Sequence, residues 1–346
     1  MTIKAAIFGA SGYTGQELTR ILSGHPQVEL VAVTSRRFAG KAVSDVFPSL
    51  YGLTSLKYED ATPERIAGLC DVAFLALPHG VSMDIAPAFV KAGKKVIDLS
   101  ADYRIRDLPT YEKWYAKHKS AVLLADAVYG LPELYRSAIE TSSLIANPGC
   151  YPTSIILGLA PVLKNGLVDP STIIADSASG VSGAGRDPLI GSLFCEVDGG
   201  FKAYKVGNHR HTPEIEQELA YLAGEAFAVT FTPHLLPVKR GILSTLYATL
   251  KKEISVGELR ELYASFYHAE AFVRVCPEGV YPNVSSVAGS NYCDIGVAVD
   301  LRTRRIIVLS AIDNLIKGAA GQAVQNMNIM CSLPEDSGLK TAPLYP

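Results

Sequence analysis

The stretch NPGCYPT, residues 147–153, places Cys150 between a turn and a proline that can start a helix. A sulfur at a helix N-terminus faces backbone N–H groups and the positive end of the helix dipole, which stabilise a thiolate. The same N–H groups can stabilise an oxyanion on a carbonyl that the sulfur attacks. The alternative is a buried, unreactive thiol, the commoner role of cysteine in an apolar setting. The turn-to-helix position of Cys150 favours the nucleophile.

A second stretch, GNHRHTPEI at residues 207–215, carries two histidines. If this segment is extended, His209 and His211 share a face, and Thr212 caps the helix that comes next. An imidazole that titrates near neutral pH can activate a thiol and protonate a developing oxyanion. The alternatives are a surface loop, or a zinc site completed by Cys150. No further ligand spacing such as H-E-x-x-H accompanies the pair, so we predict no metal.

Residues 9–15, GASGYTG, come after an apolar run typical of a strand and open a helical segment. In that context Gly9 allows a tight turn, Gly12 lets backbone approach a pyrophosphate, and Gly15 lets helix and strand pack closely. The spacing G-x-x-G-x-x-G differs from the commoner G-x-G-x-x-G, so a glycine turn without a ligand is the alternative.

The end of the next predicted strand reads Thr34-Ser35-Arg36-Arg37, where an NAD site usually has an acidic residue. A hydroxyl beside guanidinium groups suits a 2′-phosphate, because arginine offers forked donors to phosphate oxygens. This pattern favours NADP(H) over NAD(H). We expect only one of the two arginines to contact phosphate; the alternative is a solvated loop.

Two further segments have residues suited to ligands. Arg104 ends DLSADYR, residues 98–104, which leaves the end of a predicted strand. Ligands bind at such ends in doubly wound sheets, so Arg104 can hold a phosphate or carboxylate; a structural pair with Asp102 is the alternative. The glycine-rich SGVSGAGR, residues 179–186, is long enough to close over a ligand, or is a plain flexible loop.

The elements that position these residues alternate in the first 150 residues between short apolar runs and helical segments. The predicted strands are Lys4–Phe8, Val28–Val33, Val72–Leu77, Lys95–Leu99 and Leu144–Ala146. This alternation predicts an α/β domain with a Rossmann-type, doubly wound parallel sheet. After Cys150 strands have fewer intervening helices, which predicts an α+β domain with a mixed or antiparallel sheet. We expect residues 315–330 to form one long helix that packs on the first domain, with a loose tail after Ser332.

Size and composition agree with two domains, since 346 residues can bury two cores. The formal net charge of -2 leaves no basic excess for nucleic-acid binding. No apolar stretch is long enough for a membrane span, and the N-terminus leaves no room for a signal peptide, so we expect a cytoplasmic protein with no membrane partner. The six cysteines form no C-x-x-C pairs, so neither a disulfide framework nor a zinc ribbon is predicted.

Together these motifs resemble the N-acetyl-gamma-glutamyl-phosphate reductase family, which is related to aspartate-semialdehyde dehydrogenase and more distantly to glyceraldehyde-3-phosphate dehydrogenase. The resemblance covers about residues 3–328. The segments that carry it are GASGYTG, LPHG at 77–80, DLSADYR, YGLPEL at 129–134, NPGCYPT, SGVSGAGR, HRHTPEI and DNLIKGAAGQAVQNMN at 313–328.

The resemblance implies roles for individual residues. Residues 1–149, completed by a C-terminal helix in 314–346, would be the NADP-binding domain, and 150–313 the catalytic, substrate and dimerisation domain. Cys150 would be the nucleophile and His211 the acid/base, with His209 as the alternative for the latter. The residues implied in substrate binding are Arg104, Asn147, His209 and Glu214. Those implied in NADP(H) binding are Gly9, Ser11, Gly12, Tyr13, Thr14, Gly15, Ser35, Arg36, Pro78, Ser179, Gly180, Ser182, Gly183 and Asn314.

The implied reaction is the NADPH-dependent reduction of an acyl phosphate, N-acetyl-L-glutamyl 5-phosphate, to the 5-semialdehyde through a Cys150 thioester, in arginine biosynthesis. A thioester accepts hydride far better than a carboxylate does. One alternative is a reductase of a carrier-linked aminoadipyl phosphate in lysine biosynthesis; others are a Cys-His hydrolase and an NADP-sensing regulator. The resemblance also implies a homodimer or homotetramer that pairs through the sheet of the second domain.

Overall fold

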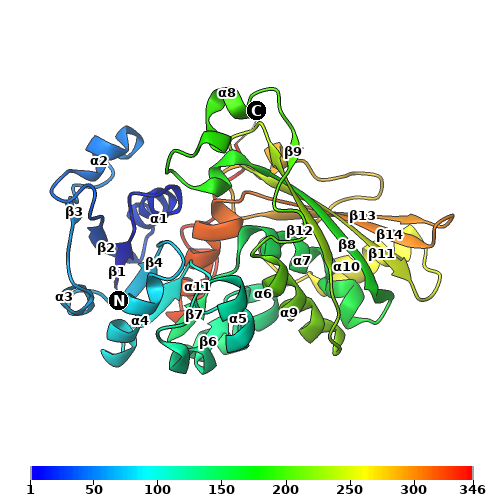
Figure 1. Cartoon of the computed structure of the whole chain (residues 1–346), viewed down its shortest axis with the longest axis horizontal. Helices are drawn as coiled ribbons and strands as arrows, with labels where there is room; N and C mark the ends of the chain where they lie inside the picture. The colour runs from blue at the N-terminus through cyan, green and yellow to red at the C-terminus, as the bar shows by residue number, and fades with distance from the viewer. Residues whose placement is uncertain (1, 345–346) are drawn as a thin grey trace. The chain divides into compact units, whose positions relative to one another are not determined.

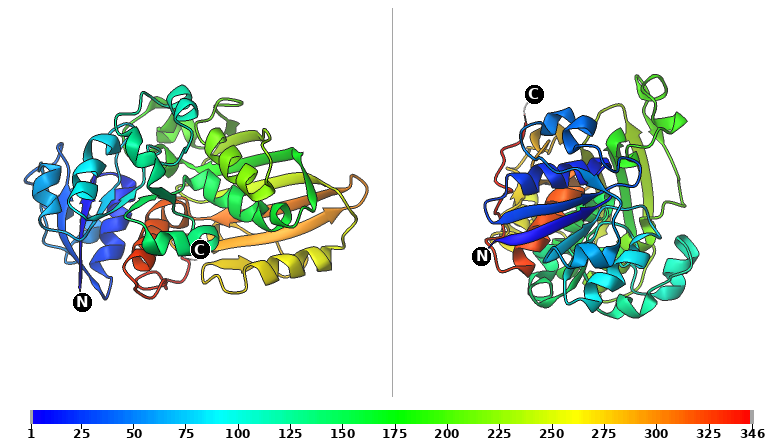
Figure 2. Two further views of the ribbon diagram at one scale, coloured as in Figure 1. Left: turned by 90° about the horizontal axis from the view of Figure 1, so that it is seen from below. Right: turned by 90° about the vertical axis from the view of Figure 1, so that its left-hand side faces the viewer.

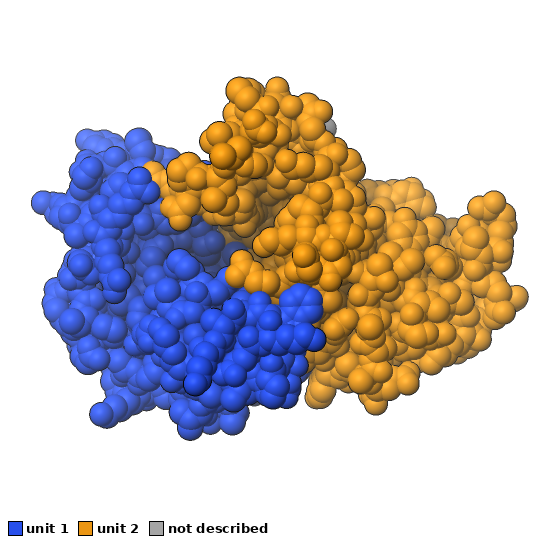
Figure 3. All heavy atoms as spheres, viewed as in Figure 1, with its two compact units in different colours: residues 1–149, 319–341 blue, residues 150–318, 342–346 orange. Residues whose placement is uncertain are grey.

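The chain folds into two compact units in the computed structural model, which describes residues 2–344 (Figure 3). The first unit holds the chain up to Gly149 together with Ala319–Thr341, and the second holds Cys150–Gly318 and the chain after Thr341. Residues 314–318 and 342–344, which were expected in the first domain, therefore group with the second. The reason is local hydrogen bonding: the Asn314 side chain bonds to residues 182 and 241, and Leu344 N–H donates to Ala288 O.

The first unit is built on a parallel sheet of seven strands in the order β3-β2-β1-β4-β5-β7-β6 (Figure 1). Its strands are β1 Ile3–Phe8, β2 Val28–Thr34, β3 Tyr58–Glu59, β4 Val72–Leu75, β5 Lys95–Asp98, β6 Ala127–Tyr129 and β7 Leu144–Ala146. The order reverses between β1 and β4, which is where doubly wound sheets bind ligands, at the carboxyl ends of the strands. The predicted parallel sheet is confirmed, and the short β3 and β6 are additions to it.

Two helices of the first unit have clear start or stop residues in the sequence. Thr62 caps the short α3, and Pro63 is the first residue of that helix. Gly93, with φ +68°, comes just after the end of α4. The helices are α1 Tyr13–Ser23, α2 Val43–Val46, α3 Pro63–Ala67, α4 Ser82–Lys91, α5 Leu108–Trp114, α6 Pro132–Thr141 and α11 Gly321–Met330, with 3-10 turns at Pro48–Leu50 and Ala121–Ala125.

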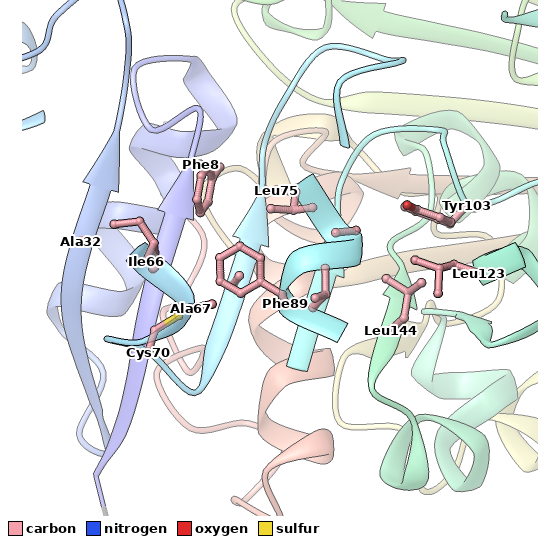
Figure 4. Packing of buried hydrophobic residues seen from close by; sticks show 14 of the residues in the cluster. Phe8, Ala32, Ile66, Ala67, Cys70, Leu75, Phe89, Tyr103, Leu123 and Leu144 are labelled. Carbon is pink, nitrogen blue, oxygen red and sulfur yellow. The ribbon is translucent and has the colours of Figure 1, made fainter. Parts of the chain in front are cut away.

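One hydrophobic cluster of the first unit lies between the sheet and the helices α3 and α4 (Figure 4). Phe89 of α4 is fully buried, and its ring lies edge-on to that of Phe8, with ring centroids 5.5 Å apart. Leu75 and Ala73 of the central strand β4 are also fully buried, as expected for a parallel sheet covered by helices. Truncating Phe89 to alanine would cost about 3–5 kcal/mol of stability.

The C-terminal helix α11 packs on α6 and α1 of the first unit, and its polar side chains are buried. Asn326 donates to Gly130 O at 2.8 Å and to Asn147 Oδ1 at 3.0 Å, and Gln322 donates to Gly130 O at 3.1 Å. These bonds satisfy the NH2 groups of both amides, whereas Gln322 Oε1 and Asn326 Oδ1 are buried without a hydrogen-bond partner among the described residues. The prediction of one helix over 315–330 was wrong in part, since a π-helical turn, Ile316–Ala320, precedes α11.

The tail from residue 333 to residue 341 is held on the first unit, so the expectation of a loose tail after Ser332 was wrong for this part of it. Glu335 accepts two hydrogen bonds from the Arg136 guanidinium, at 2.9 and 3.2 Å, and one from Gln325 at 2.7 Å. The Asn328 amide donates to the carbonyls of Glu335 and Ser337. Buried Leu339 adds an apolar contact that sequence polarity alone did not reveal.

The second unit is built on a mixed sheet of seven strands in the order β12-β13-β14-β11-β8-β10-β9. The pairs β8/β10 and β12/β13 are parallel, and the other neighbours are antiparallel, which confirms the predicted mixed sheet. The strands are β8 Val168–Gly180, β9 Lys202–Ala203, β10 Thr230–Leu236, β11 Ile242–Leu250, β12 Val273–Val275, β13 Cys293–Asp300 and β14 Arg305–Ile312.

Helices cover one face of this sheet (Figure 2). The apolar helix α7 lies on β11 and β14, and α10 lies on β13, joined to α7 by a hydrogen bond from Tyr263 to Gly158 O. The unit's helices are α7 Cys150–Lys164, α8 Phe194–Val197, α9 Thr212–Ala223 and α10 Val256–Phe266, with 3-10 turns at Val181–Ala184, Ile190–Ser192 and Val284–Ser286. In the described residues, 2–344, none of the helices is long and apolar enough to cross a membrane.

Candidate active site

The glycine turn lies between β1 and α1 and leaves no space for side chains at two of its positions. Gly9 has φ +78°, and a β-carbon there would lie 2.2 Å from Ala76 O. A β-carbon on Gly15 would lie 2.5 Å from the Cα of Ala10, so this glycine is what lets α1 pack on the turn. Gly12 is the N-cap of α1, and no side chain caps the helix there.

This geometry fits the phosphates of a dinucleotide. A helix N-terminus that no side chain caps presents backbone N–H groups and the positive end of the dipole to an anion. Tyr13 and Thr14 form the first turn of α1, with Tyr13 exposed and Thr14 half-buried. Pro78 is exposed just past β4, the neighbour of β1, and so lies at the same edge of the sheet as Gly9.

The end of β2 brings two serine hydroxyls together. Ser11 Oγ and Ser35 Oγ lie 2.8 Å apart, which ties the glycine turn to the residue after β2. The Arg36 side chain is 92% exposed and lies 3.8 Å from Asp60, whereas Arg37 lies over the Phe38 ring at 5.3 Å. The two arginines therefore occupy different surroundings, and the exposed guanidinium of Arg36 is the one suited to a 2′-phosphate.

Arg104 is buried at the carboxyl ends of β5 and β7. Its Nε and Nη2 donate to the carbonyls of Asn147 and Leu99, each at 2.7 Å. The Asn147 amide is itself held, since it donates to Ala319 O at 3.2 Å and accepts from Asn326 at 3.0 Å. These two residues have fixed positions in the first unit.

Two carboxyl groups of the segment that ends at Arg104, those of Asp98 and Asp102, are fully buried. Asp102 accepts from Gly80 N at 2.7 Å and from Tyr111 OH at 2.8 Å, and Asp98 accepts from Ser100 N and Ser100 Oγ. Burial, and then the nearby charge of Asp102, raises the pKa of Asp98 to about 6.

Cys150 is the first residue of α7 and is partly exposed, while the rest of the helix up to Leu163 is buried. Its backbone and β-carbon are packed against Gly318, where an added β-carbon would lie 2.8 Å from the β-carbon of Cys150. Cys150 therefore stands at a helix N-terminus. The segment that packs on it, at Gly318, comes more than 160 residues later in the same unit.

The rings of His209 and His211 in the HRH segment are in edge-on contact, with ring centroids 4.9 Å apart. A turn achieves this, not an extended strand: Lys205 and Gly207 have positive φ, at 47° and 72°, and residues 210–211 continue as a turn into α9. His211, not Thr212, is the N-cap of α9, since the helix starts at Thr212 and Pro213 is its second residue. Both of these local expectations, the extended segment and the Thr212 cap, were wrong.

His209 is buried, and its Nδ1 accepts a hydrogen bond from the His211 backbone N–H at 3.1 Å. An imidazole nitrogen that accepts carries no proton, so the ring is the neutral tautomer protonated on Nε2. Burial, with the positive charges of Lys205 and Arg210, lowers the pKa of His209 to about 4. Half-buried His211 is the more accessible of the two rings. Glu214 is fully buried in the first turn of α9.

Asn314 organises the loop that comes after β8. Its Nδ2 donates to Ser182 Oγ at 3.0 Å and its Oδ1 accepts from Gly241 N at 2.7 Å. Gly180 is required there, since an added β-carbon would lie 2.7 Å from Arg240 N, and Gly183 lies beside Ser179 and Asn314. Ser179 and Gly180 end β8, so this part of the predicted loop is held by the sheet.

Four residues that pack on this site were not predicted from the sequence. Tyr151 lies edge-on to the rings of His209, His211 and Phe231, and its hydroxyl accepts from Tyr204 OH at 3.0 Å. Gly318 is the fourth, through its contact with Cys150. Tyr151 is adjacent to the cysteine in the chain, but nothing in the spacing of Tyr204, Phe231 or Gly318 points to Cys150.

Two family models match the chain. Residues 4–142 match the semialdehyde dehydrogenase NAD binding domain, and residues 150–314 match the semialdehyde dehydrogenase dimerisation domain. The parallel sheet with its glycine turn and the mixed domain with its helix-terminal cysteine define a two-domain α/β protein of the dinucleotide-binding class. The chain belongs to the semialdehyde dehydrogenase family and, within it, to the N-acetyl-gamma-glutamyl-phosphate reductases.

Full-length relatives place the chain among these reductases. The N-acetyl-gamma-glutamyl-phosphate reductase of Desulfotalea psychrophila is 60% identical over 345 residues, covering 99% of this chain and 100% of the relative. The protein of the same name from Citrifermentans bemidjiense is 59% identical over the same lengths. The family expected from the sequence motifs is confirmed.

Solved structures of more distant proteins share the fold. Aspartate semialdehyde dehydrogenase II from Vibrio cholerae, complexed with ASA, aligns with a TM-score of 0.73 at 18% identity over 96% of this chain and 99% of that one. The Candida albicans aspartate semialdehyde dehydrogenase with NADP aligns with a TM-score of 0.70 at 20% identity, over the same shares. At such identities the likeness concerns the fold alone.

Proposed function

We propose that this protein reduces N-acetyl-L-glutamyl 5-phosphate with NADPH, giving N-acetyl-L-glutamate 5-semialdehyde and phosphate. The observation that carries the proposal is the placement of Cys150 as the first residue of α7, directly before Tyr151, on whose ring both His209 and His211 pack. A cysteine at a helix N-terminus, with two imidazoles packed on the next residue of that helix, is suited to acyl transfer. The names of the full-length relatives agree with this substrate.

The proposed NADP(H) site uses the glycine turn and the loops at the strand ends. N–H groups at the start of α1 would bind the pyrophosphate, with Gly9, Gly12 and Gly15 giving the room. Ser35 and Arg36 would bind the 2′-phosphate, and Ser11 would orient Ser35 through their 2.8 Å contact. The remaining proposed cofactor residues are Tyr13, Thr14, Pro78, Ser179, Gly180, Ser182, Gly183 and Asn314.

In the first half of the proposed reaction the Cys150 thiolate attacks the acyl carbon. A carbon–sulfur bond forms, the bond from carbon to the phosphate oxygen breaks, and phosphate leaves with the electron pair. Backbone N–H groups at the start of α7 can stabilise the oxyanion of the tetrahedral intermediate. The product of this half is a thioester on Cys150.

The second half reduces that thioester. NADPH, when bound, would supply the hydride for the carbonyl carbon. His211 donates a proton to the oxygen of the tetrahedral adduct and takes that proton back as the carbon–sulfur bond breaks, which releases the aldehyde and returns Cys150 to the thiolate. One hydride is consumed in each turnover, one proton from solvent is taken up by the departing phosphate, and the protein ends as it began.

His211 is the better acid/base of the two histidines. A proton donor near neutral pH needs a pKa near the working pH, and burial lowers that of His209 to about 4. His209 is also committed as an acceptor to the His211 backbone. We propose His209, Glu214, Arg104 and Asn147 as substrate-binding residues, with Arg104 and Asn147 acting from positions fixed by their own hydrogen bonds.

We also propose the roles of the two parts of the chain. The part before Cys150, with the C-terminal helix, would bind NADP(H), and the part from Cys150 to Asp313 would carry catalysis and pairing between copies. A homodimer or homotetramer paired through the mixed sheet, and a cytoplasmic location, belong to the same proposal. The family name of residues 150–314, a dimerisation domain, supports pairing.

The reverse reaction tests the proposed function. Protein is mixed with N-acetyl-L-glutamate 5-semialdehyde, NADP+ and phosphate, and the absorbance of NADPH is followed. We expect turnover that requires phosphate and that is lost in Cys150→Ser. A parallel assay with carrier-linked aminoadipate semialdehyde tests the alternative substrate, and turnover with that compound alone would overturn the proposed substrate.

A further inference from the structure

Three aromatic rings of the second unit surround His209 and, with His209 and His211 of the HRH segment, form a cluster of five rings. His209 lies at their centre, with ring centroids 5.6 Å from Tyr151, 5.6 Å from Tyr204, 5.3 Å from Phe231 and 4.9 Å from His211. All four contacts are edge-on, at interplanar angles from 68° to 87°. The rings come from α7, from β10 and from the segment before the turn, so the cluster joins three elements around one imidazole.

The two phenols of the cluster form a chain of hydrogen bonds. Tyr204 OH donates to Tyr151 OH at 3.0 Å, and Tyr151 OH donates to the His234 carbonyl at 3.2 Å. The Tyr204 backbone N–H donates to Pro233 O, which fixes the segment to β10. Burial above all, with a contribution from the charge of Cys150, raises the pKa of Tyr204 to about 12 and that of Tyr151 as well. Both phenols are therefore protonated donors at any working pH.

The cluster affects the position of the His211 main chain indirectly, through His209. The hydrogen bond from His211 N–H to His209 Nδ1 exists only while Nδ1 carries no proton. The charged and titratable groups that face His209 are Lys205 and Arg210 from its own segment, His211, the phenols Tyr151 and Tyr204, and near those phenols Cys150. Phe231 from β10 adds only an apolar surface.

We propose that Tyr204 and Tyr151 are positioning residues that keep His209 uncharged, so that His209 in turn holds the main chain of His211 in its working geometry. This inference rests on the proposed function, in which His211 handles the proton. The tyrosines do this in two ways: their rings keep water away from the imidazole, and their hydroxyl chain anchors the rings to β10. A protonated His209 would present an N–H to another N–H, and the turn would open.

The test compares Tyr204→Leu with Tyr204→Phe in the full chain. Leucine removes the aromatic cover and phenylalanine keeps it, so only the former should let water reach His209. In Tyr204→Leu we expect the pKa of His209, followed by NMR of 15N-labelled imidazole, to rise by about one unit or more. The acidic limb of the pH profile of kcat/KM should move to higher pH together with the pKa of His209. Tyr204→Phe should leave that limb in place and lower kcat by roughly fivefold, the effect of one ordinary hydrogen bond.

Tyr221→Phe is the matched control, because Tyr221 lies 65% exposed on α9, outside the cluster. It should match the parent in pH profile and in the His209 titration. An unchanged His209 titration in Tyr204→Leu, or a loss of activity that is uniform across pH, would overturn the inference. Failure of the proposed function is distinguishable, because the parent protein would then show no turnover while the NMR titration would still report on His209.

Discussion

The backbone of Gly318 packs directly on Cys150, so that a β-carbon added at residue 318 would lie 2.8 Å from the Cys150 β-carbon. Gly318 belongs to the π-helical turn Ile316–Ala320, and its N–H donates to Asp313 O. Asp313 is fully buried and also accepts from Gly289 N and from Arg240. The position of the proposed nucleophile is thus set by a turn far away in sequence.

Gly318→Ala should displace Cys150, because the added methyl group would lie too close to the Cys150 β-carbon. Misplacing the reacting sulfur should lower turnover at least about tenfold. Alkylation of Cys150 by iodoacetamide, read by peptide mapping, should slow as well. The control is Gly257→Ala in the first turn of α10, where the nearest atom to an added β-carbon is 4.0 Å away. Equal turnover in the two variants would show that the contact with Gly318 does not position Cys150.

Arg36→Asp should weaken NADPH binding at least about tenfold and bring the affinity for NADH closer to that for NADPH, because the carboxylate repels a 2′-phosphate. Fluorescence titration with both nucleotides measures this. Arg37→Asp makes the same charge change at a guanidinium that lies over Phe38, and it should have a much smaller effect. Matching losses in the two variants would mean that general charge, not a contact from Arg36, favours the phosphate.

Asp98 should make the folded state less stable as the pH rises through about 6. Its folded pKa, about 6, lies above the ordinary aspartate value of 3.8, so the folded state binds the proton more tightly in the window between them. The Tm of Asp98→Asn minus the Tm of the parent should therefore increase as the pH rises from about 4 to about 7. Asp126→Asn makes the same change at an exposed side chain and serves as the control. A flat difference for Asp98→Asn would disprove the raised pKa.

Glu335→Ala should free the C-terminal tail and cost about 1–3 kcal/mol, because it removes a carboxylate that accepts from both half-buried Arg136 and buried Gln325. Limited proteolysis should then cut after Ser332 faster than in the parent. Lys340→Ala, which removes an exposed pair with Asp336, should change neither stability nor cleavage appreciably. Unchanged cleavage in Glu335→Ala would mean that the Asn328 hydrogen bonds and buried Leu339 hold the tail without the Glu335 carboxylate.

Features that depend on residues close together in the chain could be predicted from the sequence. The strand–glycine–helix order predicted β1, the turn at Gly9 and α1, and the alternation of apolar runs with helical segments predicted the parallel sheet. The NPGCYPT turn predicted that Cys150 stands at a helix start. Propensity and patterning act over such short separations, which is why these predictions succeed.

Features that depend on contacts between distant segments could not be predicted. The cluster around His209 joins Tyr151, Tyr204 and Phe231 from three elements, and no spacing encodes it. The polar tail after Ser332 suggested a loose segment, yet its residues pair with Arg136 and Asn328. A turn at 210–211 replaces the extended conformation expected for HRH, and the turn before it begins at Lys205, which takes a positive φ that its residue type does not indicate.

Cys150 forms a thioester in the proposed mechanism, and the mass of the intact protein reports on this step. The protein is mixed with N-acetyl-L-glutamyl 5-phosphate without NADPH, quenched in acid and weighed, with peptide mapping to locate any adduct. We expect a gain of one N-acetylglutamyl group on the peptide that contains Cys150, which disappears when NADPH is added before the quench, and no gain in Cys150→Ser. An unmodified Cys150 in protein that turns over under the same conditions, or an adduct on another residue, would contradict the thioester mechanism.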